Sequence, residues 1–256
     1  MGGRLRERRV LVVGGSGNIG SAIVRALAAE GAFVAMASRA GQRLKDASQR
    51  MKKDGFDVFA VVLDVTSPES VDEAVHLLGS HWGGIDVLFN CAGTGMAEFN
   101  PGFAHSAIPF YSYRLNALRT AMDTDYFGCF AVMQAFIPVF REQGRGMIVN
   151  VSIDQDMANL RGFAPIFPAK AAVNALTAIA AREFEGSGIS VNLLTPGGFV
   201  GGGMIPTDAP EENFGKLLSP EVMADAAVFL ASDEASGING RHIVAREFSR
   251  ETFLNH

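Results

Sequence analysis

Short apolar segments alternate with segments of helical periodicity along most of the chain. The apolar segments cover residues 8–15, 32–39, 56–65, 85–93, 146–153, 189–198 and 240–245. The helical segments cover residues 20–31, 42–55, 67–83, 123–144, 169–186 and 219–236. Strands that are apolar on both faces and separated by helices predict a parallel sheet covered on both sides. We therefore expect an α/β protein with a doubly wound parallel sheet, as a single domain over residues 1–256.

Composition narrows the class of protein and its partners. The chain is 48% hydrophobic and 19% charged, as expected for a globular protein with a large interior. Its net charge of −5 and its scattered basic residues argue against nucleic-acid and membrane partners. Cys91 and Cys129 are too few for a disulfide framework or a metal cluster, and no apolar run approaches the roughly 20 residues that span a bilayer. A cytoplasmic protein without a metal site is predicted.

Two segments interrupt the regular alternation. Residues 94–115 are aromatic-rich (Phe99, Phe103, Phe110, Tyr111, Tyr113), and residues 197–219 are rich in glycine and proline. Both follow predicted strands at their carboxyl ends, where ligands bind in such sheets. Because long loops in compact domains are often lids or binding segments, both are predicted to cover a substrate.

A glycine-rich turn joins the first predicted strand to the first helix. Gly14, Gly17 and Gly20 are spaced by three residues. Glycine permits a tight turn, close approach of the backbone to a pyrophosphate, and close packing of helix on sheet. The helix amino terminus adds free N–H groups and a partial positive charge. This turn predicts a dinucleotide site, and hence the Rossmann fold.

The end of the second strand indicates which dinucleotide binds. An NAD site usually has an acidic residue there, whereas this chain has Ser38 and Arg39. A guanidinium suits a ribose 2′-phosphate through charge-assisted hydrogen bonds. The predicted cofactor is NADP.

With these motifs, the chain resembles the short-chain dehydrogenase/reductase family over nearly its whole length. The resemblance rests on "GGSGNIG" (14–20), "LDV" (63–65), "NCAG" (90–93), "VNLLTPGG" (191–198) and "ADAAVFLASDEASGINGRHIVA" (224–245), although "REFS" replaces the family's D-G-G ending. It implies that Asp64 contacts adenine and that the Pro196–Gly197 turn lies beside the nicotinamide. The resulting cofactor set is Gly14, Ser16, Gly17, Asn18, Ile19, Gly20, Ser38, Arg39, Asp64, Val65, Asn90, Ala92, Gly93, Lys170, Pro196, Gly197 and Val200.

The family's catalytic pattern is matched only in part. Lys170 fits its lysine, but Ile166 stands where the tyrosine of Tyr-x-x-x-Lys would be. The serine position falls on Ile153, and the asparagine position on Asp125. A slip of one residue would bring Ser152 into the serine position, but it would turn that side chain to the opposite face of the strand. An atypical member that lacks the tyrosine and the serine is predicted.

Several groups remain as candidates for the proton donor. Lys170 is expected to bind the nicotinamide ribose, as the resemblance implies. Asp154 and Asp156 follow the fifth strand, and Asp125 lies on the facing helix. A carboxyl in an apolar pocket has a raised pKa and can act as a general acid. A relay through Lys170, the ribose and water, or an acidic phenol of the substrate, are the alternatives.

These features predict an atypical NADPH-dependent reductase of a ketone, enone or quinone-like group on a bulky hydrophobic, polycyclic aromatic substrate. The alternatives are a non-redox enzyme on the same scaffold (a cyclase, dehydratase or isomerase), or a catalytically silent NADP-binding subunit. Residues 127–140 and 171–181 are apolar on more than one face. That pattern predicts a homodimer or homotetramer.

Overall fold

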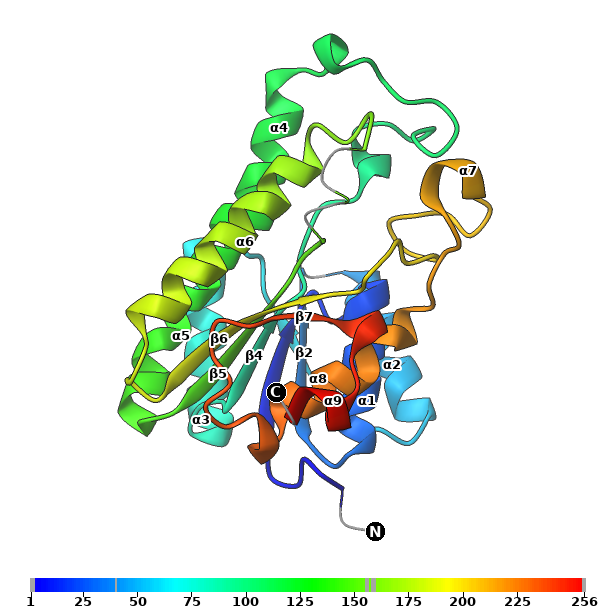
Figure 1. Ribbon diagram of the computed structural model, residues 1–256. Helices are drawn as coiled ribbons and strands as arrows, with labels where there is room; N and C mark the ends of the chain where they lie inside the picture. The colour runs from blue at the N-terminus through cyan, green and yellow to red at the C-terminus, as the bar shows by residue number, and fades with distance from the viewer. Residues whose placement is uncertain (1–2, 40, 155–156, 158–159, 255–256) are drawn as a thin grey trace.

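Seven parallel strands form the centre of the protein, in the order β3-β2-β1-β4-β5-β6-β7. The structure is a computed structural model that describes residues 3–39, 41–154, 157 and 160–254. The strands are β1 Arg9–Val13, β2 Phe33–Ser38, β3 Val58–Val62, β4 Val87–Asn90, β5 Gly146–Val151, β6 Ile189–Thr195 and β7 His242–Val244 (Figure 1). This is the predicted doubly wound α/β sheet, and the fold prediction is confirmed.

Helices cover both faces of the sheet, as the alternating pattern requires. They are α1 Asn18–Ala29, α2 Gln42–Lys53, α3 Pro68–Trp82, α4 Leu115–Ala121, α5 Gly128–Gln143, α6 Ile166–Glu183, α7 Glu211–Phe214, α8 Ala224–Ala231 and α9 Arg250–Leu254. A π-helical turn, η3 (Met122–Phe127), joins α4 to α5. Short 3₁₀ turns are η1 Met96–Glu98, η2 Phe110–Ser112, η5 Pro220–Met223, η6 Asp233–Ala235 and η7 Ala245–Glu247.

The direction of strand order reverses between β1 and β4, and this switch point locates the expected ligand site. Val13 pairs with Asn90 where the two strands end, and Asn90 pairs with Asn150 on β5. Ligands of open α/β sheets bind in the crevice beyond these carboxyl ends.

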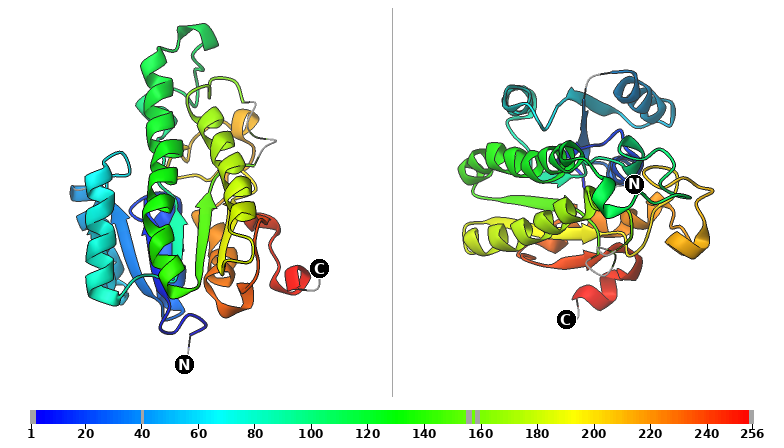
Figure 2. Two further views of the ribbon diagram at one scale, coloured as in Figure 1. Left: turned by 90° about the vertical axis from the view of Figure 1, so that its left-hand side faces the viewer. Right: turned by 90° about the horizontal axis from the view of Figure 1, so that it is seen from above.

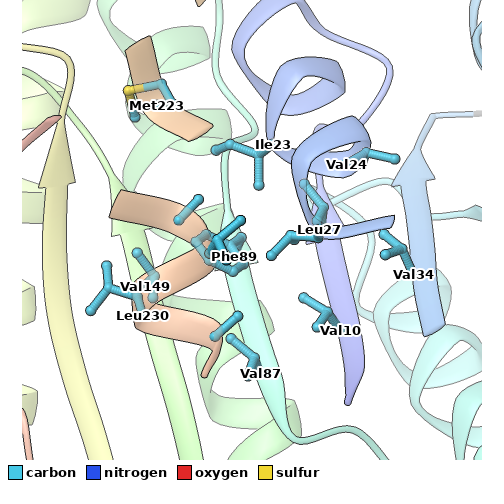
Figure 3. Packing of buried hydrophobic residues seen from close by; sticks show 14 of the residues in the cluster. Val10, Ile23, Val24, Leu27, Val34, Val87, Phe89, Val149, Met223 and Leu230 are labelled. Atoms are coloured by element: carbon cyan, nitrogen blue, oxygen red, sulfur yellow. The ribbon is translucent and has the colours of Figure 1, made fainter. Parts of the chain in front are cut away.

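The interior consists of one apolar layer on each face of the sheet. On one face, Phe89 packs among Val10, Leu27 and Leu230, and all four side chains are buried (Figure 3). On the other face, Phe136 and Phe140 of α5 pack against buried residues of β1, β4 and β5. Burial on both faces explains why the strands are apolar without alternation.

Two helices extend beyond the carboxyl edge of the sheet. The helix formed by α4, η3 and α5 rises above the strands beside α6 (Figures 1 and 2). The predicted helix at 123–144 therefore begins earlier, at Leu115. Likewise α6 begins at Ile166 and includes Pro168 in its first turn, where the missing N–H of proline costs no hydrogen bond.

A third apolar cluster lies above the sheet. The segment 94–115 contributes Met96 and Phe103, the segment 197–219 contributes Ile205 and Phe214, and Phe163 joins them. Phe103, Phe163 and Phe214 contact one another edge to face, with ring centroids 5.8–6.3 Å apart. The cluster brings the two predicted lid segments together above the carboxyl ends of the strands.

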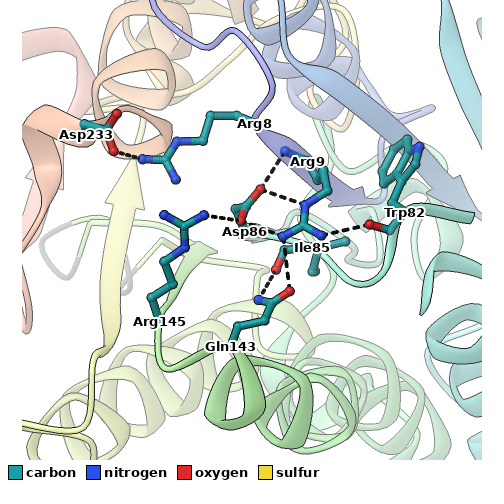
Figure 4. Close-up of polar contacts among 8 residues, drawn as sticks. All are labelled: Arg8, Arg9, Trp82, Ile85, Asp86, Gln143, Arg145 and Asp233. Carbon is teal, nitrogen blue, oxygen red and sulfur yellow. Dashed lines mark hydrogen bonds and ion pairs between the residues drawn. The ribbon is translucent and has the colours of Figure 1, made fainter.

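The opposite end of the sheet carries a paired polar network. Asp86, just before β4, accepts hydrogen bonds from the Arg9 backbone N–H and Nε, both at 3.0 Å, and from Arg9 Nη2 at 2.8 Å (Figure 4). Arg145 Nη2 lies 3.3 Å from the same carboxylate. These bonds satisfy a buried charge at the base of the fold.

Candidate active site and cofactor cleft

The glycine-rich turn has the close contacts that its sequence requires. Gly14 has a φ of +80°, and a Cβ there would lie 2.6 Å from the backbone nitrogen of Ala92. A Cβ on Gly20 would lie 2.2 Å from the carbonyl oxygen of Gly14. Only glycine allows this turn to pack so closely on the segment after β4 and on its own helix.

The amino terminus of α1 fits an anionic group. Its N-cap is Gly17, which has no side chain to accept a hydrogen bond from the first turn. By contrast, Ser67 caps α3 by accepting a hydrogen bond from the N–H of Ser70. The first N–H groups of α1 therefore lack a capping partner, as a pyrophosphate site requires.

Polar and cationic groups gather at the end of β2. Ser16 Oγ donates to Ser38 Oγ over 2.9 Å, and the exposed Arg39 follows directly. Arg43, in the first turn of α2, reaches back so that its Nε lies 3.3 Å from the carbonyl oxygen of Ser16. Arg43 was absent from the predicted set. Its position four residues after Arg39, at the start of a helix, is the signal that would have found it.

Asp64 and Val65, after β3, have different surroundings. Asp64 Oδ1 accepts hydrogen bonds from the N–H and hydroxyl of Thr66, at 2.9 and 2.7 Å. These bonds hold the pKa of the Asp64 carboxyl below its usual range, and the charge of Arg39 adds to the effect. Val65 is buried and packs on Gly128, where a Cβ would lie 2.5 Å from Val65 Cγ2.

The turn after β4 connects the cofactor cleft to the catalytic candidates. Asn90 Nδ2 donates to Asn150 Oδ1 over 2.9 Å in the sheet interior. A Cβ on Gly93 would lie 3.0 Å from both Asp125 Oδ1 and Lys170 Nζ. Glycine at 93 thus lets the backbone pass directly over these two side chains.

Asp125 and Lys170 form a buried pair between two helices. Their side chains are 0% and 8% exposed, and Asp125 Oδ2 lies 4.0 Å from Lys170 Nζ. The backbone N–H of Thr94 donates to Asp125 Oδ1 over 2.7 Å. Burial raises the pKa of the Asp125 carboxyl, against the opposing effects of Lys170 and the Thr94 N–H. Asp125 lies on the π-helical turn η3, a feature often found at functional sites.

Ile153 and Ile166, which the sequence comparison above predicts at the serine and tyrosine positions, have apolar surroundings. Ile166 is buried in the cluster above the sheet, and Ile153 packs against the same cluster. Ser152 Oγ instead donates to the carbonyl oxygen of Lys170 over 3.2 Å, so its hydroxyl faces the α6 backbone. This placement agrees with the argument from strand alternation.

The remaining carboxylate candidates differ from Asp125. Asp154 accepts hydrogen bonds from Thr195 Oγ1 at 2.5 Å and from the Gly197 N–H at 3.1 Å. Burial disfavours its charge, but the bonds from His242 and Thr195 prevail and leave the pKa of Asp154 below its usual range. The premise that an apolar pocket raises the carboxyl pKa therefore applies to Asp125 and fails for Asp154. Asp156 lies outside the described residues.

The second predicted lid segment contacts the glycine-rich turn directly. Asn18 Nδ2 donates to the carbonyl oxygen of Gly201 over 2.7 Å. Val200 is buried and pairs with Leu218 in an isolated bridge. The segment is thus held against the start of α1, beside the glycine-rich turn.

The aromatic residues of 94–115 do not act as one group. Phe103 is buried in the cluster, and Phe99 and Tyr113 pack against it. Phe110 and Tyr111 are 81% and 87% exposed. These two aromatics therefore lie at the surface, apart from the cluster that holds Phe103.

Known proteins are similar to this chain in sequence and in fold. A family model described as enoyl-(acyl carrier protein) reductase matches residues 14–246. The chain belongs to the short-chain dehydrogenase/reductase family. It is therefore an oxidoreductase of that kind, in a family whose dehydrogenases use nicotinamide cofactors.

Individual relatives cover nearly the whole chain. The 2,5-dichloro-2,5-cyclohexadiene-1,4-diol dehydrogenase LinX of Sphingobium indicum is 31% identical over 94% of this chain and 95% of its own. A 3-alpha-(or 20-beta)-hydroxysteroid dehydrogenase of Mycobacterium bovis is 32% identical over 95% of this chain and 90% of its own. A crystal structure of a short-chain type dehydrogenase/reductase from Mycobacterium marinum is 25% identical, with a TM-score of 0.80 and 94% of each chain covered.

In the part of the chain that the structure describes, no three His, Cys, Asp or Glu side chains are grouped as metal ligands. Over the same residues, no helix is long and apolar enough to pass through a membrane.

Proposed function

We propose that the protein is an NADPH-dependent reductase that uses the buried pair of Asp125 and Lys170 in place of the family's tyrosine. Its substrate would carry a ketone, enone or quinone-like group on a bulky hydrophobic ring system. The proposal rests on this pair, because the Asp125 carboxyl has a raised pKa and lies 4.0 Å from the Lys170 amine. Both groups lie close to Gly93. Ile166 and Ile153 have no group that donates a proton or a hydrogen bond.

The cofactor would lie across the carboxyl ends of β1, β2 and β4. The glycine-rich turn and the α1 amino terminus would bind its pyrophosphate, and Arg39, Arg43 and Ser38 its 2′-phosphate. When bound, the reduced cofactor supplies the hydride that the carbonyl carbon accepts. Negative charge then develops on the carbonyl oxygen, and the Asp125–Lys170 pair would supply its proton. Water would return that proton to the pair after the alcohol leaves.

The substrate class is inferred from the cluster above the sheet. Phe103, Phe199 and Phe214 belong to the same apolar cluster as Ile153 and Ile166, so a substrate that reaches these isoleucines would meet aromatic neighbours. Such walls favour a flat apolar ring over a charged metabolite. The two relatives above are named for a dichlorocyclohexadiene diol and for hydroxysteroids, which are also carbocyclic compounds.

Cofactor choice is tested with two arginine variants. Arg39→Ala and Arg43→Ala should each weaken NADPH binding about tenfold and leave NADH binding within about twofold, because only NADPH has the 2′-phosphate. Arg50→Ala, in the last turn of α2, is the matched control and should change neither affinity. Equal loss of NADPH and NADH binding in the Arg39 variant would contradict the assignment.

Catalysis is tested with NADPH and a panel of steroid, decalone and quinone substrates beside small ketones. Steady oxidation of NADPH with ring substrates is expected. If NADPH binds tightly but is not oxidised with any substrate of the panel, the protein would instead be the non-catalytic subunit. Turnover of a substrate after removal of all cofactor would indicate the non-redox enzyme.

We also propose that the long helices pair two or four copies of the chain. Leu115, Phe127, Phe130 and Ile179 are large apolar side chains that are 43–62% exposed on α4, η3, α5 and α6. Sedimentation should give a dimer or tetramer that Phe130→Glu weakens. A monomer at micromolar concentration would contradict this.

A further inference from the structure

A half-buried carboxylate contacts two strands beside the expected nicotinamide position. Asp154 lies three residues beyond β5, and it contacts the last residue of β6 and the first residue of β7. One of its oxygens accepts the Thr195 hydroxyl, and the other accepts the Gly197 N–H. His242 Nε2 lies 2.9 Å from Thr195 Oγ1 and 3.5 Å from Asp154 Oδ1. The carboxylate therefore holds side chain and backbone on both sides of Pro196.

The turn at Gly197 is also held from its other side. Gly197 has a φ of +81°, and a Cβ there would lie 2.7 Å from Val244 Cγ1 and 2.9 Å from Arg246 Cβ. The Arg246 N–H donates to the carbonyl oxygen of Pro196 over 3.2 Å. With Asp154 on one side and residues 244–246 on the other, the turn has little freedom to shift.

We propose that Asp154 is a positioning residue that fixes the Pro196–Gly197 turn for the nicotinamide end of the cofactor. This inference rests on the proposed function, since it requires that NADP bind in the cleft. Asp154 acts through the backbone of the turn and has no part in proton transfer. Both of its oxygens already accept hydrogen bonds from the protein, as a fixed, ionised carboxylate would.

The test compares two ligands that share one end. Adenosine 2′,5′-bisphosphate has the adenosine 2′-phosphate end of NADPH and lacks the nicotinamide. Removing both acceptors in Asp154→Ala should weaken NADPH binding about tenfold, because the Gly197 N–H and Thr195 hydroxyl lose their partner and the turn loosens. Binding of the bisphosphate should change less than about twofold. Both affinities are measurable by calorimetry, without turnover.

Two milder variants guard against a simple folding defect. Asp154→Asn keeps the volume and one acceptor oxygen, and Thr195→Val keeps the Gly197 contact. Both should show the same selective loss in NADPH binding, at smaller size. Equal weakening of both ligands, or unchanged binding of both, would overturn the inference. Failure of the wild type to bind either ligand would instead overturn the proposed function, and the inference with it.

Discussion

Asp86 and Asp125 are both buried aspartates, and they lie near opposite ends of β4. Asp86 accepts three hydrogen bonds from Arg9 and lies 3.3 Å from Arg145 Nη2 (Figure 4). Asp125 accepts a hydrogen bond from the Thr94 N–H at 2.7 Å and longer ones from the Thr94 hydroxyl, 3.4 Å from each oxygen, and its lysine is 4.0 Å away. The pKa of Asp86 is lowered because these bonds prevail over burial, whereas burial raises the pKa of Asp125.

The two carboxylates differ in how completely the protein compensates their charge. At the amino end of the strand, a fully paired carboxylate ties β1 to the segments before β4 and β5. At the carboxyl end, burial outweighs the partners of Asp125 and favours the protonated form of its carboxyl. Perturbed groups of this second kind concentrate at functional sites.

The largest expected effect is on catalysis. Asp125→Asn keeps the shape and the acceptor for the Thr94 N–H but removes the acidic proton. The kcat for reduction of a ring ketone should fall about 10²- to 10⁴-fold, the usual contribution of a positioned general acid. Asp86→Asn is the matched control and should leave kcat within about threefold. A kcat of Asp125→Asn within twofold of wild type would remove Asp125 from the mechanism.

The two variants should rank in the opposite order when stability is measured, with the larger loss in Asp86→Asn. Asp86→Asn leaves the Arg9 guanidinium without its carboxylate, and urea unfolding should show a loss of about 3 kcal/mol in the free energy of unfolding. Asp125→Asn should cost less than half as much, because its pairing with Lys170 is loose. Equal losses in the two variants would show that the carboxylates do not differ as described.

A smaller effect concerns pH. A lowered pKa means that Asp86 stabilises the fold above the ordinary carboxyl value of about 4, and this contribution is lost as pH falls through its folded pKa. A raised pKa means that Asp125 favours the fold below that value, and this contribution is lost as pH rises through its folded pKa. As pH increases from 4 to 8, the free energy of unfolding of wild type minus that of Asp86→Asn should therefore rise or stay constant. The free energy of unfolding of wild type minus that of Asp125→Asn should fall over the same range. Urea unfolding across this range measures both.

Much of this arrangement follows from the sequence. Continuous apolar strands between helices predicted the parallel sheet, and the spacing of Gly14, Gly17 and Gly20 predicted the close turn before α1. Spacing to Lys170 also identified Ile166, whose side chain lies in the apolar cluster. These inferences need only local pattern and strand alternation.

The choice among carboxylates did not follow from the sequence. Asp125 and Asp154 differ through partners that are distant in the chain, namely Thr94 for one and Thr195, Gly197 and His242 for the other. The pKa of a carboxyl depends on such partners and on burial, which no local pattern gives. Arg43 was missed although the start of its helix was predicted, because its contact with the Ser16 carbonyl depends on how the side chain folds back.

Asp125 is expected to stay protonated over a pH range in which Asp86 is ionised. Carbon-13 NMR of aspartate carboxyls, assigned with Asp125→Asn and Asp86→Asn, measures both titrations in the wild-type protein without any substrate. The Asp125 carboxyl should titrate above its ordinary value, and the Asp86 carboxyl below it. Titration of Asp125 at or below the pH at which Asp86 titrates would contradict the proposed role of Asp125.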